Sequence, residues 1–190
     1  MELRAWEERY RSAERPAEDF EAAANPLLVE TAKQLRPGKA LDLACGTGRN
    51  AIWLAERGWT VTAVDGAAAA IEILRQRVSS RSLTVDAIIA DLANHEYRIA
   101  PSSWDLIAIC YYLQRDLFAV TKQGLVPGGI LLAIVHLAER GDEATEHRLR
   151  PGELAGYFRD WDILHRYEGQ PNDAAHQRRV AEIVARRPAK

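Results

Sequence analysis

Short apolar runs of strand length alternate with amphipathic segments of helix length from Gly38 onward. The runs are rich in Val, Ile and Leu and carry few polar residues, which is typical of strands buried on both faces of a sheet. This alternation predicts βαβ units around a parallel sheet. The predicted strands cover residues 39–45, 60–65, 83–91, 104–112 and 129–135.

The intervening and flanking segments complete the predicted fold. Helices are expected at 49–57, which Gly58 ends, and at 67–78, where apolar residues recur at helical spacing. Upstream, 3–14 and 25–35 predict two helices separated by a break near Pro16 and Asn25. After the Pro-Gly-Gly sequence at 127–129 come a charged loop (139–150), a short helix (151–158) and strands at 161–169 and 178–186. The predicted fold class is α/β: a doubly wound (Rossmann-like), mostly parallel seven-stranded sheet with an antiparallel last strand and helices on both faces.

Composition narrows the classes of function that fit this fold. With 190 residues a single domain over 1–190 is expected, and 25 Lys and Arg against 27 Asp and Glu leave a net charge of −2. No broad cationic surface is therefore expected, which disfavours nucleic acid and anionic membranes as partners. The longest apolar run, Ile130 to Val135, is too short to span a bilayer. The charged N-terminus and the two cysteines, Cys45 and Cys110, favour a cytoplasmic protein without disulfide or metal.

A glycine-rich turn follows the first predicted strand in the sequence ALDLACGTGRNAIWLAERGWTVTAVD (40–65). Gly46 and Gly48 allow a tight bend and let a ligand approach the backbone, since glycine carries no Cβ. Asp65 ends the second strand nineteen residues after Gly46, where a carboxylate can accept hydrogen bonds from both hydroxyls of a ribose. The pattern predicts a site for an adenosine-containing cofactor, although a plain strand-to-helix turn is the simpler alternative.

Two classes of cofactor fit such a turn, and Asp42 favours one of them. The residues GTGRNA satisfy the dinucleotide pattern Gly-x-Gly-x-x-Gly/Ala. Asp42 precedes Gly46 by four residues, and a carboxylate there would repel a pyrophosphate. It suits a ligand with an ammonium or sulfonium group, such as S-adenosylmethionine, unless Asp42 is only a solvated turn residue.

The same stretch resembles motif I and the following segment of class I S-adenosylmethionine-dependent methyltransferases. Three further segments extend the resemblance: IIADL at 88–92, LVPGGILLAIV at 125–135 and VARRP at 184–188. Within that class the chain is most similar to small tellurite-resistance-like methyltransferases, over about residues 38–187. The resemblance implies cofactor-binding roles for residues of the turn and of the strand ends: Asp42, Ala44, Cys45, Gly46, Thr47, Gly48, Asn50, Asp65, Gly66, Asp91, Leu92, Cys110 and Tyr111.

Two departures from the related enzymes weaken any inference about substrate. The segment after the fourth strand, ICYYLQRD (109–116), lacks the Asn-Pro-Pro-Tyr type of motif used to methylate amide or base nitrogens. Tellurite-resistance-like enzymes often have a His-Arg pair in the turn between the last two strands. Here His165 and Arg166 lie earlier, and His176 has no adjoining arginine.

Candidate catalytic residues follow the fourth and fifth strands, because ligands of doubly wound sheets bind at the carboxyl ends of the strands. Tyr111 and Tyr112 could hold a cationic methyl donor through their ring faces, with Cys110 beside them. His136 is the imidazole best placed to act as a general base. The alternatives are that one tyrosine packs into the core and the other covers the sheet, and that His136 is a hydrogen-bonded surface residue.

The N-terminal residues 1–36 are expected to form a helical lid over the core at 37–190. Trp6 and Tyr10 are four residues apart and share one helical face, and similar W-x-x-R-Y openings in related small methyltransferases cross the cofactor cleft. Trp6, Tyr10 and Arg11 are therefore expected near the cofactor. A helix that packs only for stability is the alternative.

The sequence as a whole predicts S-adenosylmethionine-dependent methyl transfer to a small-molecule acceptor by in-line displacement. A monomer or homodimer without nucleic-acid or membrane partners is expected. Two alternatives stay open at this point: an NAD(P)-dependent reductase, and a non-catalytic S-adenosylmethionine-binding module.

Overall fold

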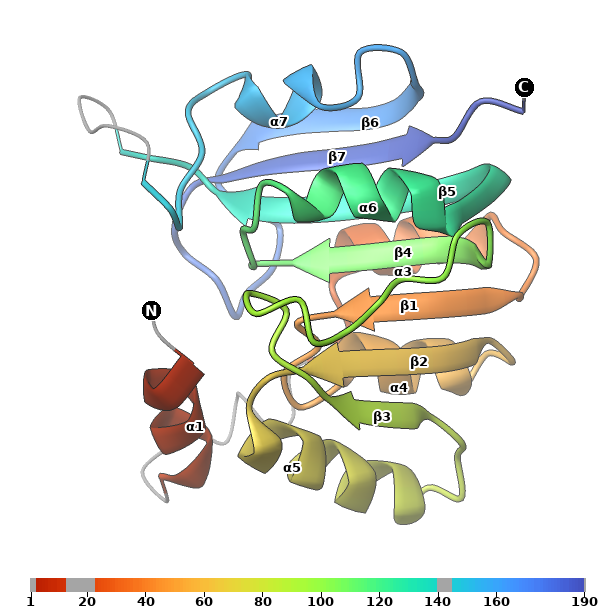
Figure 1. Ribbon diagram of the computed structural model, residues 1–190, viewed down its shortest axis with the longest axis vertical. Coiled ribbons are helices and arrows are strands. Elements are labelled where there is room, and N and C mark those ends of the chain that lie inside the picture. The colour runs from red at the N-terminus through yellow and green to blue at the C-terminus, as the bar shows by residue number, and fades with distance from the viewer. Residues whose placement is uncertain (1–2, 13–22, 140–144, 190) are drawn as a thin grey trace. The chain divides into compact units, whose positions relative to one another are not determined.

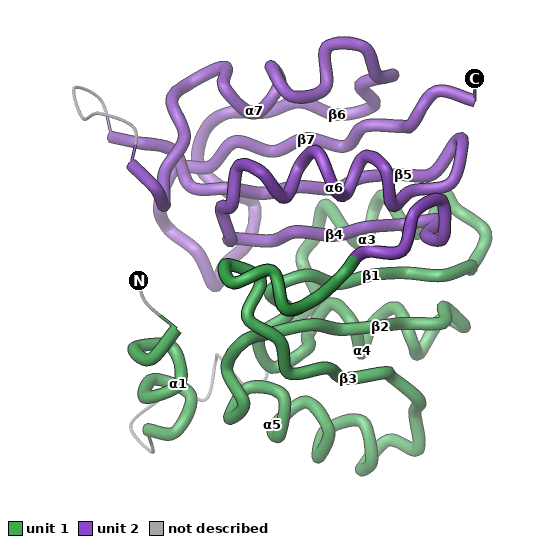
Figure 2. The backbone as a smooth tube through the Cα atoms, viewed as in Figure 1, with its two compact units in different colours: residues 1–98 green, residues 99–190 purple. Residues whose placement is uncertain are grey.

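The computed structural model describes residues 3–12, 23–139 and 145–189. The predicted break near Pro16 and part of the predicted loop 139–150 lie outside these residues. The chain divides into two compact units, residues 1–98 and 99–190, which Figure 2 shows in separate colours.

Unit 1 contains three parallel strands, β1 (Lys39–Leu43), β2 (Thr60–Asp65) and β3 (Asp86–Ile89). β2 lies between the other two, and the register pairs Asp42 of β1 with Ala63 of β2. Its helices are α1 (Leu3–Arg11), α3 (Pro26–Lys33), α4 (Arg49–Ala55) and α5 (Ala68–Ser79). In Figure 1, α1 lies beside the first turn of α5.

Local sequence explains where these helices begin. The Asn25 side chain accepts hydrogen bonds from the amides of Leu27 and Leu28, and Pro26 occupies the first turn of α3, where its missing N–H costs nothing. α4 begins directly after Gly48, whose φ of +80° favours glycine. α5 buries the residues predicted from their helical spacing, including Leu74.

Unit 2 contains β4 (Trp104–Cys110), α6 (Leu117–Gly124), β5 (Leu125–His136), α7 (Glu153–Gly156), β6 (Asp162–Gly169) and β7 (Val180–Arg186). β4 and β5 are parallel, whereas β7 pairs antiparallel with both β5 and β6. α6 is seen along β5 in Figure 1. β5 contains an unbroken run of seven buried residues, 129–135.

The predicted fold class is confirmed. The seven strands have the order β3-β2-β1-β4-β5-β7-β6, and β7 is antiparallel to its neighbours. The order reverses after β1, which is the doubly wound arrangement with its switch point between β1 and β4.

Several element boundaries differ from the sequence prediction, for local reasons. β5 begins at Leu125, before Pro127, because the pairing with β4 continues through a register shift between Trp104 and Leu106. β3 covers only 86–89 of the predicted 83–91. α7 is only four residues long and starts after Gly152, which has a φ of +79°. None of the described helices is long and apolar enough to cross a membrane.

Candidate active site

Asp42 is a buried carboxylate at the end of β1. Asp42 is only 1% exposed, and its Oδ2 has no hydrogen-bond partner among the described residues. The structure therefore rules out the alternative of a solvated turn residue. An ionised carboxylate with an unpartnered oxygen is costly to bury, so this oxygen is poised for a donor that the protein itself does not supply.

Burial raises the pKa of Asp42 to about 7. The guanidinium of Arg49 and the backbone of Ala51 act in the opposite direction, and the neighbouring charge of Asp65 adds a smaller upward effect. Desolvation is the dominant cause because it penalises the charged form of a buried acid. A cation bound next to Asp42 would restore its ionised state.

Asp65 lies at the end of β2 and organises the glycine turn. Its Oδ2 accepts a hydrogen bond from the Gly46 amide at 2.8 Å, and its Oδ1 accepts one from the Ala67 amide at 2.8 Å. Burial raises the pKa of Asp65 above its ordinary value, the two amides oppose that rise, and the charge of Glu7 adds to it. Each carboxylate oxygen can accept a second hydrogen bond, so the residue remains suited to a diol.

Each of the two glycines of the turn leaves room for a different neighbouring side chain. A Cβ on Gly46 would lie 2.9 Å from the Tyr10 hydroxyl, a flexible side-chain end. A Cβ on Gly48 would lie 2.1 Å from Cδ1 of Leu74, a fully buried residue of α5. The structure thus gives Gly48 a packing role that the sequence pattern does not reveal. Ala44, also in the turn, has a φ of +54°, which a non-glycine residue rarely adopts.

Three other predicted residues of the turn are engaged by the protein itself. The carbonyl and hydroxyl oxygens of Thr47 accept hydrogen bonds from Arg77. The side chain of Asn50 accepts one from the Asn25 amide at 2.9 Å, which ties α4 to the start of α3. Cys45 has its thiol 3.5 Å from the Gly46 carbonyl oxygen, and burial raises the pKa of that thiol well above its usual range, so it is unsuited to nucleophilic attack.

Helix α1 lies against this turn through three side chains. Tyr10 contacts Gly46, Leu3 lies where a Cβ of Gly66 would be (2.8 Å), and Glu7 Oε2 accepts a hydrogen bond from the Ala69 amide at 3.0 Å. That carboxylate occupies the N-terminus of α5, where no side chain of α5 provides a cap. The Glu7 carboxylate thus anchors α1 to the first turn of α5.

The other predicted residues of α1 do not all turn toward the site. Trp6 and Tyr10 stack with ring centroids 5.9 Å apart, as their spacing predicted. Arg11 is exposed and pairs with Glu7 at 2.8 Å.

The turn after β3 contains Asp91 and Leu92. Leu92 is buried, whereas the Asp91 carboxylate accepts hydrogen bonds from the Ala93 amide and the Asn94 side chain, both at 2.9 Å. The Asp91 amide donates to Glu96. Asp91 thus holds its own turn in this structure.

In unit 2, Tyr111 follows β4 directly and has a strained backbone. Its φ is +63°, which is a genuine outlier for a bulky residue and costs about 1–3 kcal/mol. The hydroxyl donates a hydrogen bond to Asp173 Oδ2 at 2.8 Å. The ring stacks on His176 with centroids 3.4 Å apart and lies 5.5 Å from the ring of His136.

His136, the last residue of β5, is half-buried, and its Nδ1 is buried without a hydrogen-bond partner among the described residues. Burial, helped by the charges of Arg178 and Arg148, lowers the pKa of His136 below 6.5, and the backbone of Arg179 opposes this. A neutral imidazole at neutral pH can accept a proton.

Tyr112 and Cys110 flank Tyr111 and are both half-buried. The Tyr112 hydroxyl donates to Gln114 Oε1 at 3.0 Å. The next residue, Arg115, forms an ion pair of 2.7 Å with Glu153 and lines an open hollow of about 570 Å³ with residues 150–153. Neither tyrosine is fully buried, so the alternative of a core tyrosine does not describe either one.

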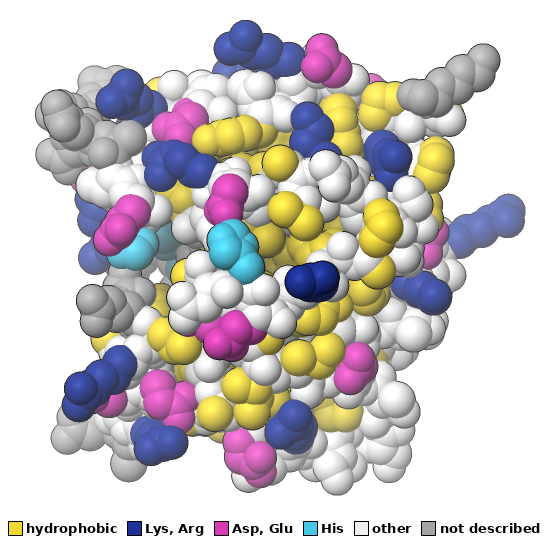
Figure 3. Space-filling model, in the orientation of Figure 1, with side chains coloured by type: hydrophobic (Ala, Val, Ile, Leu, Met, Phe, Trp, Pro, Cys, Tyr) yellow, Lys and Arg dark blue, Asp and Glu magenta, His cyan; other side chains and the backbone are white. Residues whose placement is uncertain are grey.

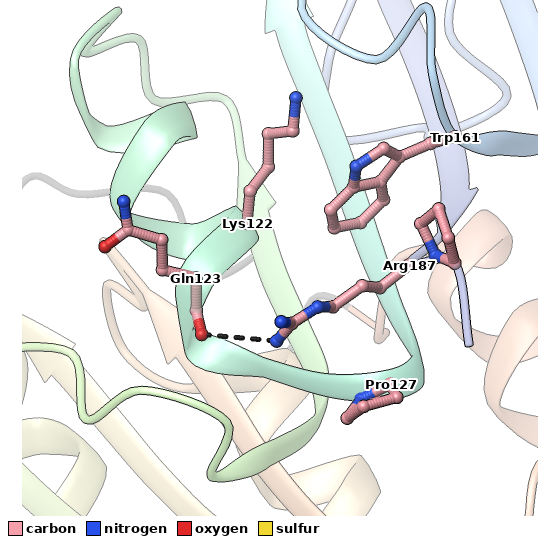
Figure 4. Close-up of a pocket in the computed structure, with 6 residues that line it drawn as sticks. Lys122, Gln123, Pro127, Trp161 and Arg187 are labelled. Carbon is pink, nitrogen blue, oxygen red and sulfur yellow. Dashed lines mark hydrogen bonds between the residues drawn. The ribbon is translucent and has the colours of Figure 1, made fainter. Parts of the chain in front are cut away.

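A second hollow of about 230 Å³ lies elsewhere in unit 2, lined by Lys122, Gln123, Pro127, Trp161, Arg187 and Pro188 (Figure 4). It adjoins the amino end of β5, whereas Tyr111 and His136 lie at the carboxyl ends of β4 and β5. Arg187 donates to the Gln123 and Leu125 carbonyls, and Lys122 donates to the Tyr157 carbonyl. Its cations therefore serve the fold.

Among the residues described, no group of three or more His, Cys, Asp or Glu side chains could hold a metal ion.

The fold and the turn define a class: nucleotide-cofactor proteins of the Rossmann-like methyltransferase type. The family model of the tellurite resistance protein TehB matches residues 20–178, so the chain belongs to this family. This membership favours S-adenosylmethionine over a dinucleotide as the cofactor.

Individual relatives agree with this family. The "probable S-adenosyl-L-methionine-dependent methyltransferase TehB" of Haemophilus influenzae strain 10810 is 34% identical over 147 residues, which are 72% of this chain and 50% of that protein. The chain thus spans about half the length of this curated relative. The crystal structure of TehB from Haemophilus influenzae superposes with a TM-score of 0.73 at 24% identity, covering 84% of this chain and 61% of that one.

The fold by itself leaves the reaction open. The structure of a protein named the [4+2]-cyclase SpnF has a TM-score of 0.70 at 19% identity and covers 95% of this chain and 84% of that one. A fold shared with a cyclase has to be supplemented by the chemistry of the site.

Three residues of the site were not predicted as such. The sequence pattern singles out neither Glu7 nor Asp173, and it distinguishes His176 only by the lack of an adjoining arginine. His165, the other histidine considered, lies in β6 and contacts Glu182 at 3.0 Å. Only the occurrence of Asp173 and His176 in the turn between the last two strands could have pointed to them.

Proposed function

We propose that this chain transfers the methyl group of S-adenosylmethionine to a small-molecule acceptor by in-line displacement. The observation that carries the proposal is Asp42: a buried carboxylate with an unpartnered oxygen beside a glycine turn. Dinucleotides would bring phosphate charge to this point, and a carboxylate repels it. The sulfonium cofactor instead brings positive charge and supplies an activated methyl group.

In this proposal Asp65 binds the ribose hydroxyls, the backbone of Gly46 lies against the cofactor, and Asp42 complements its positive charge. Leu92 offers an apolar surface for the adenine. The remaining residues of the turn support this arrangement by their hydrogen bonds to α5 and α3. Residues 1–36 are the lid, and 1–190 act together as one methyltransferase domain.

The contacts of α1 support the lid. Leu3, Glu7 and Tyr10 all contact the segments that follow β1 and β2. Helix α1 is distant from these segments in the sequence and meets them through its side chains. A lid excludes water and so strengthens fixed electrostatic contacts with a bound ligand.

On the acceptor side, Tyr111, Tyr112 and His136 are the proposed catalytic residues. The lowered pKa of His136 favours the neutral form that accepts a proton. Strain at Tyr111 supports a functional role, because a backbone conformation this costly persists only where surrounding structure imposes it.

The proposed partner is a small molecule, not nucleic acid or a membrane, and the chain is proposed to act as a monomer or homodimer in the cytoplasm. Basic and acidic side chains are interspersed over the face drawn in Figure 3, without a single-sign stripe. Both cysteines are free thiols, which suits a reducing compartment.

Cofactor binding is tested by thermal unfolding with S-adenosylmethionine, S-adenosylhomocysteine or NADH. A ligand that binds only the folded state raises the melting temperature, so both sulfur ligands should raise it and NADH should not. A shift with NADH alone would contradict the cofactor proposal.

Methyl transfer is tested with labelled S-adenosylmethionine and three acceptors: tellurite, which the family's name suggests, 2-mercaptoethanol as a thiol, and catechol as a phenol. Methyltransferase activity is supported if the wild type transfers label to any of these acceptors and Asp65→Ala does not. Binding of the cofactor without transfer to any of the three acceptors would favour the non-catalytic module.

A further inference from the structure

Tyr111 is held by two side chains from one short loop, the segment between β6 and β7. Asp173 Oδ2 accepts the hydrogen bond of its hydroxyl at 2.8 Å, and His176 stacks on its ring at an interplanar angle of 12°. Within the loop, the His176 amide donates to the Asp173 carbonyl at 2.9 Å, and Asp173 Oδ1 accepts from the Ala175 amide at 3.1 Å. This turn directs both side chains to the same ring.

Asp173 is only 6% exposed, although it belongs to a loop. Carboxylates are rarely buried unless they are paired, because burial removes their hydration. A loop that only covered an aromatic ring could do so with an apolar residue at lower cost. Asp173 accepts hydrogen bonds from the Tyr111 hydroxyl and from the Ala175 amide, so its buried carboxylate is held directly on the hydroxyl of a tyrosine with a strained backbone.

We infer that Asp173 is a positioning residue that fixes the Tyr111 hydroxyl and accepts its proton when Tyr111 deprotonates the methyl acceptor. The inference rests on the proposed methyl transfer. The acceptor atom loses its proton to Tyr111 Oη and forms its bond to the methyl carbon. The carbon–sulfur bond breaks with its electron pair on sulfur, Tyr111 passes its own proton to Asp173 Oδ2, and Asp173 releases it to water.

Other titratable and charged groups surround Tyr111 and compete for this role. His136 comes from β5, His176 from the same loop as Asp173, and the charges of Arg148 and Arg178 act on His136. Asp173 is the carboxylate whose hydrogen bond to the Tyr111 hydroxyl the structure shows. Substitution at Asp173 therefore separates this path from one through His136.

The test compares Asp173→Asn, Tyr111→Phe and their double variant with the wild type, and uses Asp160→Asn, an exposed acid of the same unit, as control. Initial rates are measured with S-adenosylmethionine and 2-mercaptoethanol. Below the pKa of the thiol, Asp173→Asn should lower kcat about 100-fold, the lower end of what general acid–base catalysis contributes, while KM changes little. The double variant should be no slower than Tyr111→Phe, because the two residues act in one path.

The pH dependence provides the readout that a merely structural role would not change. Above the pKa of 2-mercaptoethanol the thiol ionises without help, so the rate of Asp173→Asn should approach that of the wild type there. Asp160→Asn should match the wild type at every pH.

A second readout needs neither turnover nor cofactor. With [ζ-¹³C]tyrosine, the resonance that Tyr111→Phe removes should shift in Asp173→Asn and stay in place in Asp160→Asn. Calorimetric affinity for S-adenosylhomocysteine should be unchanged in Asp173→Asn and in Asp160→Asn.

The outcomes separate this inference from the proposed function. If the wild type methylates the thiol and Asp173→Asn keeps its kcat and pH profile, the inference is overturned and methyl transfer stands. A variant that is equally slow at high and low pH has lost structure only, which also overturns it. If the wild type binds the cofactor but methylates none of the three acceptors, the proposed function fails and this inference fails with it.

Discussion

The buried acid Asp42 leads to a quantitative prediction about the pH dependence of stability. Its folded-state pKa of about 7 replaces an ordinary value of 3.8. One pKa unit corresponds to about 1.4 kcal/mol, so ionised Asp42 destabilises the folded protein by roughly 4 kcal/mol. The effect is absent below the unfolded-state pKa, grows as pH rises from about 4 to 7, and is complete above pH 7.

Asp42→Asn removes this titration. The variant gains up to about 4 kcal/mol at pH 8 relative to the wild type, less the ~1–3 kcal/mol of an amide donor left without a partner. At pH 4 only that loss remains, so the variant is there the less stable of the two. The ionisation of Asp42 is measured by how much the difference in unfolding free energy between variant and wild type changes from pH 4 to pH 8. The size of that difference at a single pH does not measure it.

The assay is urea unfolding of both proteins in the absence of ligand at several values from about pH 4 to pH 8. Asp86→Asn, an exposed acid at the start of β3, is the matched control and should follow the wild type. A free-energy difference between Asp42→Asn and wild type that stays constant over this range would refute the reasoning, because Asp42 would then titrate alike in both states.

The same variant should bind the cofactor less well. Hydrogen bonds to charged groups are worth about 1.5–3 kcal/mol, which corresponds to a roughly ten- to hundredfold loss of affinity for S-adenosylmethionine. A variant that is more stable at pH 8 and yet binds more weakly would identify Asp42 as an acid retained for its ligand.

Three further predictions concern the site. Asp65→Ala should weaken calorimetric affinity for S-adenosylmethionine at least about tenfold, with Asp86→Ala unchanged; equal affinities would remove the ribose role. If His136 and not Tyr111 takes the acceptor's proton, the wild-type rate should fall as His136 becomes protonated below pH 6.5, and His136→Ala should flatten that profile; an unchanged profile in the variant would exclude the histidine as base. Deleting residues 1–15 should weaken cofactor binding with little change in the unliganded melting temperature, whereas lost stability with intact affinity would mean that α1 only packs.

The sequence alone determined the fold class, the cofactor class and much of the glycine turn. The apolar runs predict buried parallel strands by their length and by their lack of polar alternation. Both faces of such strands are covered, so successive residues are apolar. Gly46 and Asp65 belong to the same βαβ unit and are close in the sequence. Their spacing can therefore be read directly from the sequence. The predicted bounds of β2 at 60–65 are those of the structure.

Only the tertiary structure decided which side chains meet across long separations. Asp173 and Tyr111 are 62 residues apart, as are Glu7 and Ala69, and no periodicity encodes either pair. The burial of Asp42, its unpartnered oxygen and its raised pKa likewise depend on what surrounds it after folding. Gly48 shows the same limit: the sequence reveals that a glycine is present, but only the packed α5 reveals that Leu74 leaves no room for a Cβ. Hydrophobic pattern specifies which elements form, whereas the chemistry of a site depends on contacts that exist only once those elements pack.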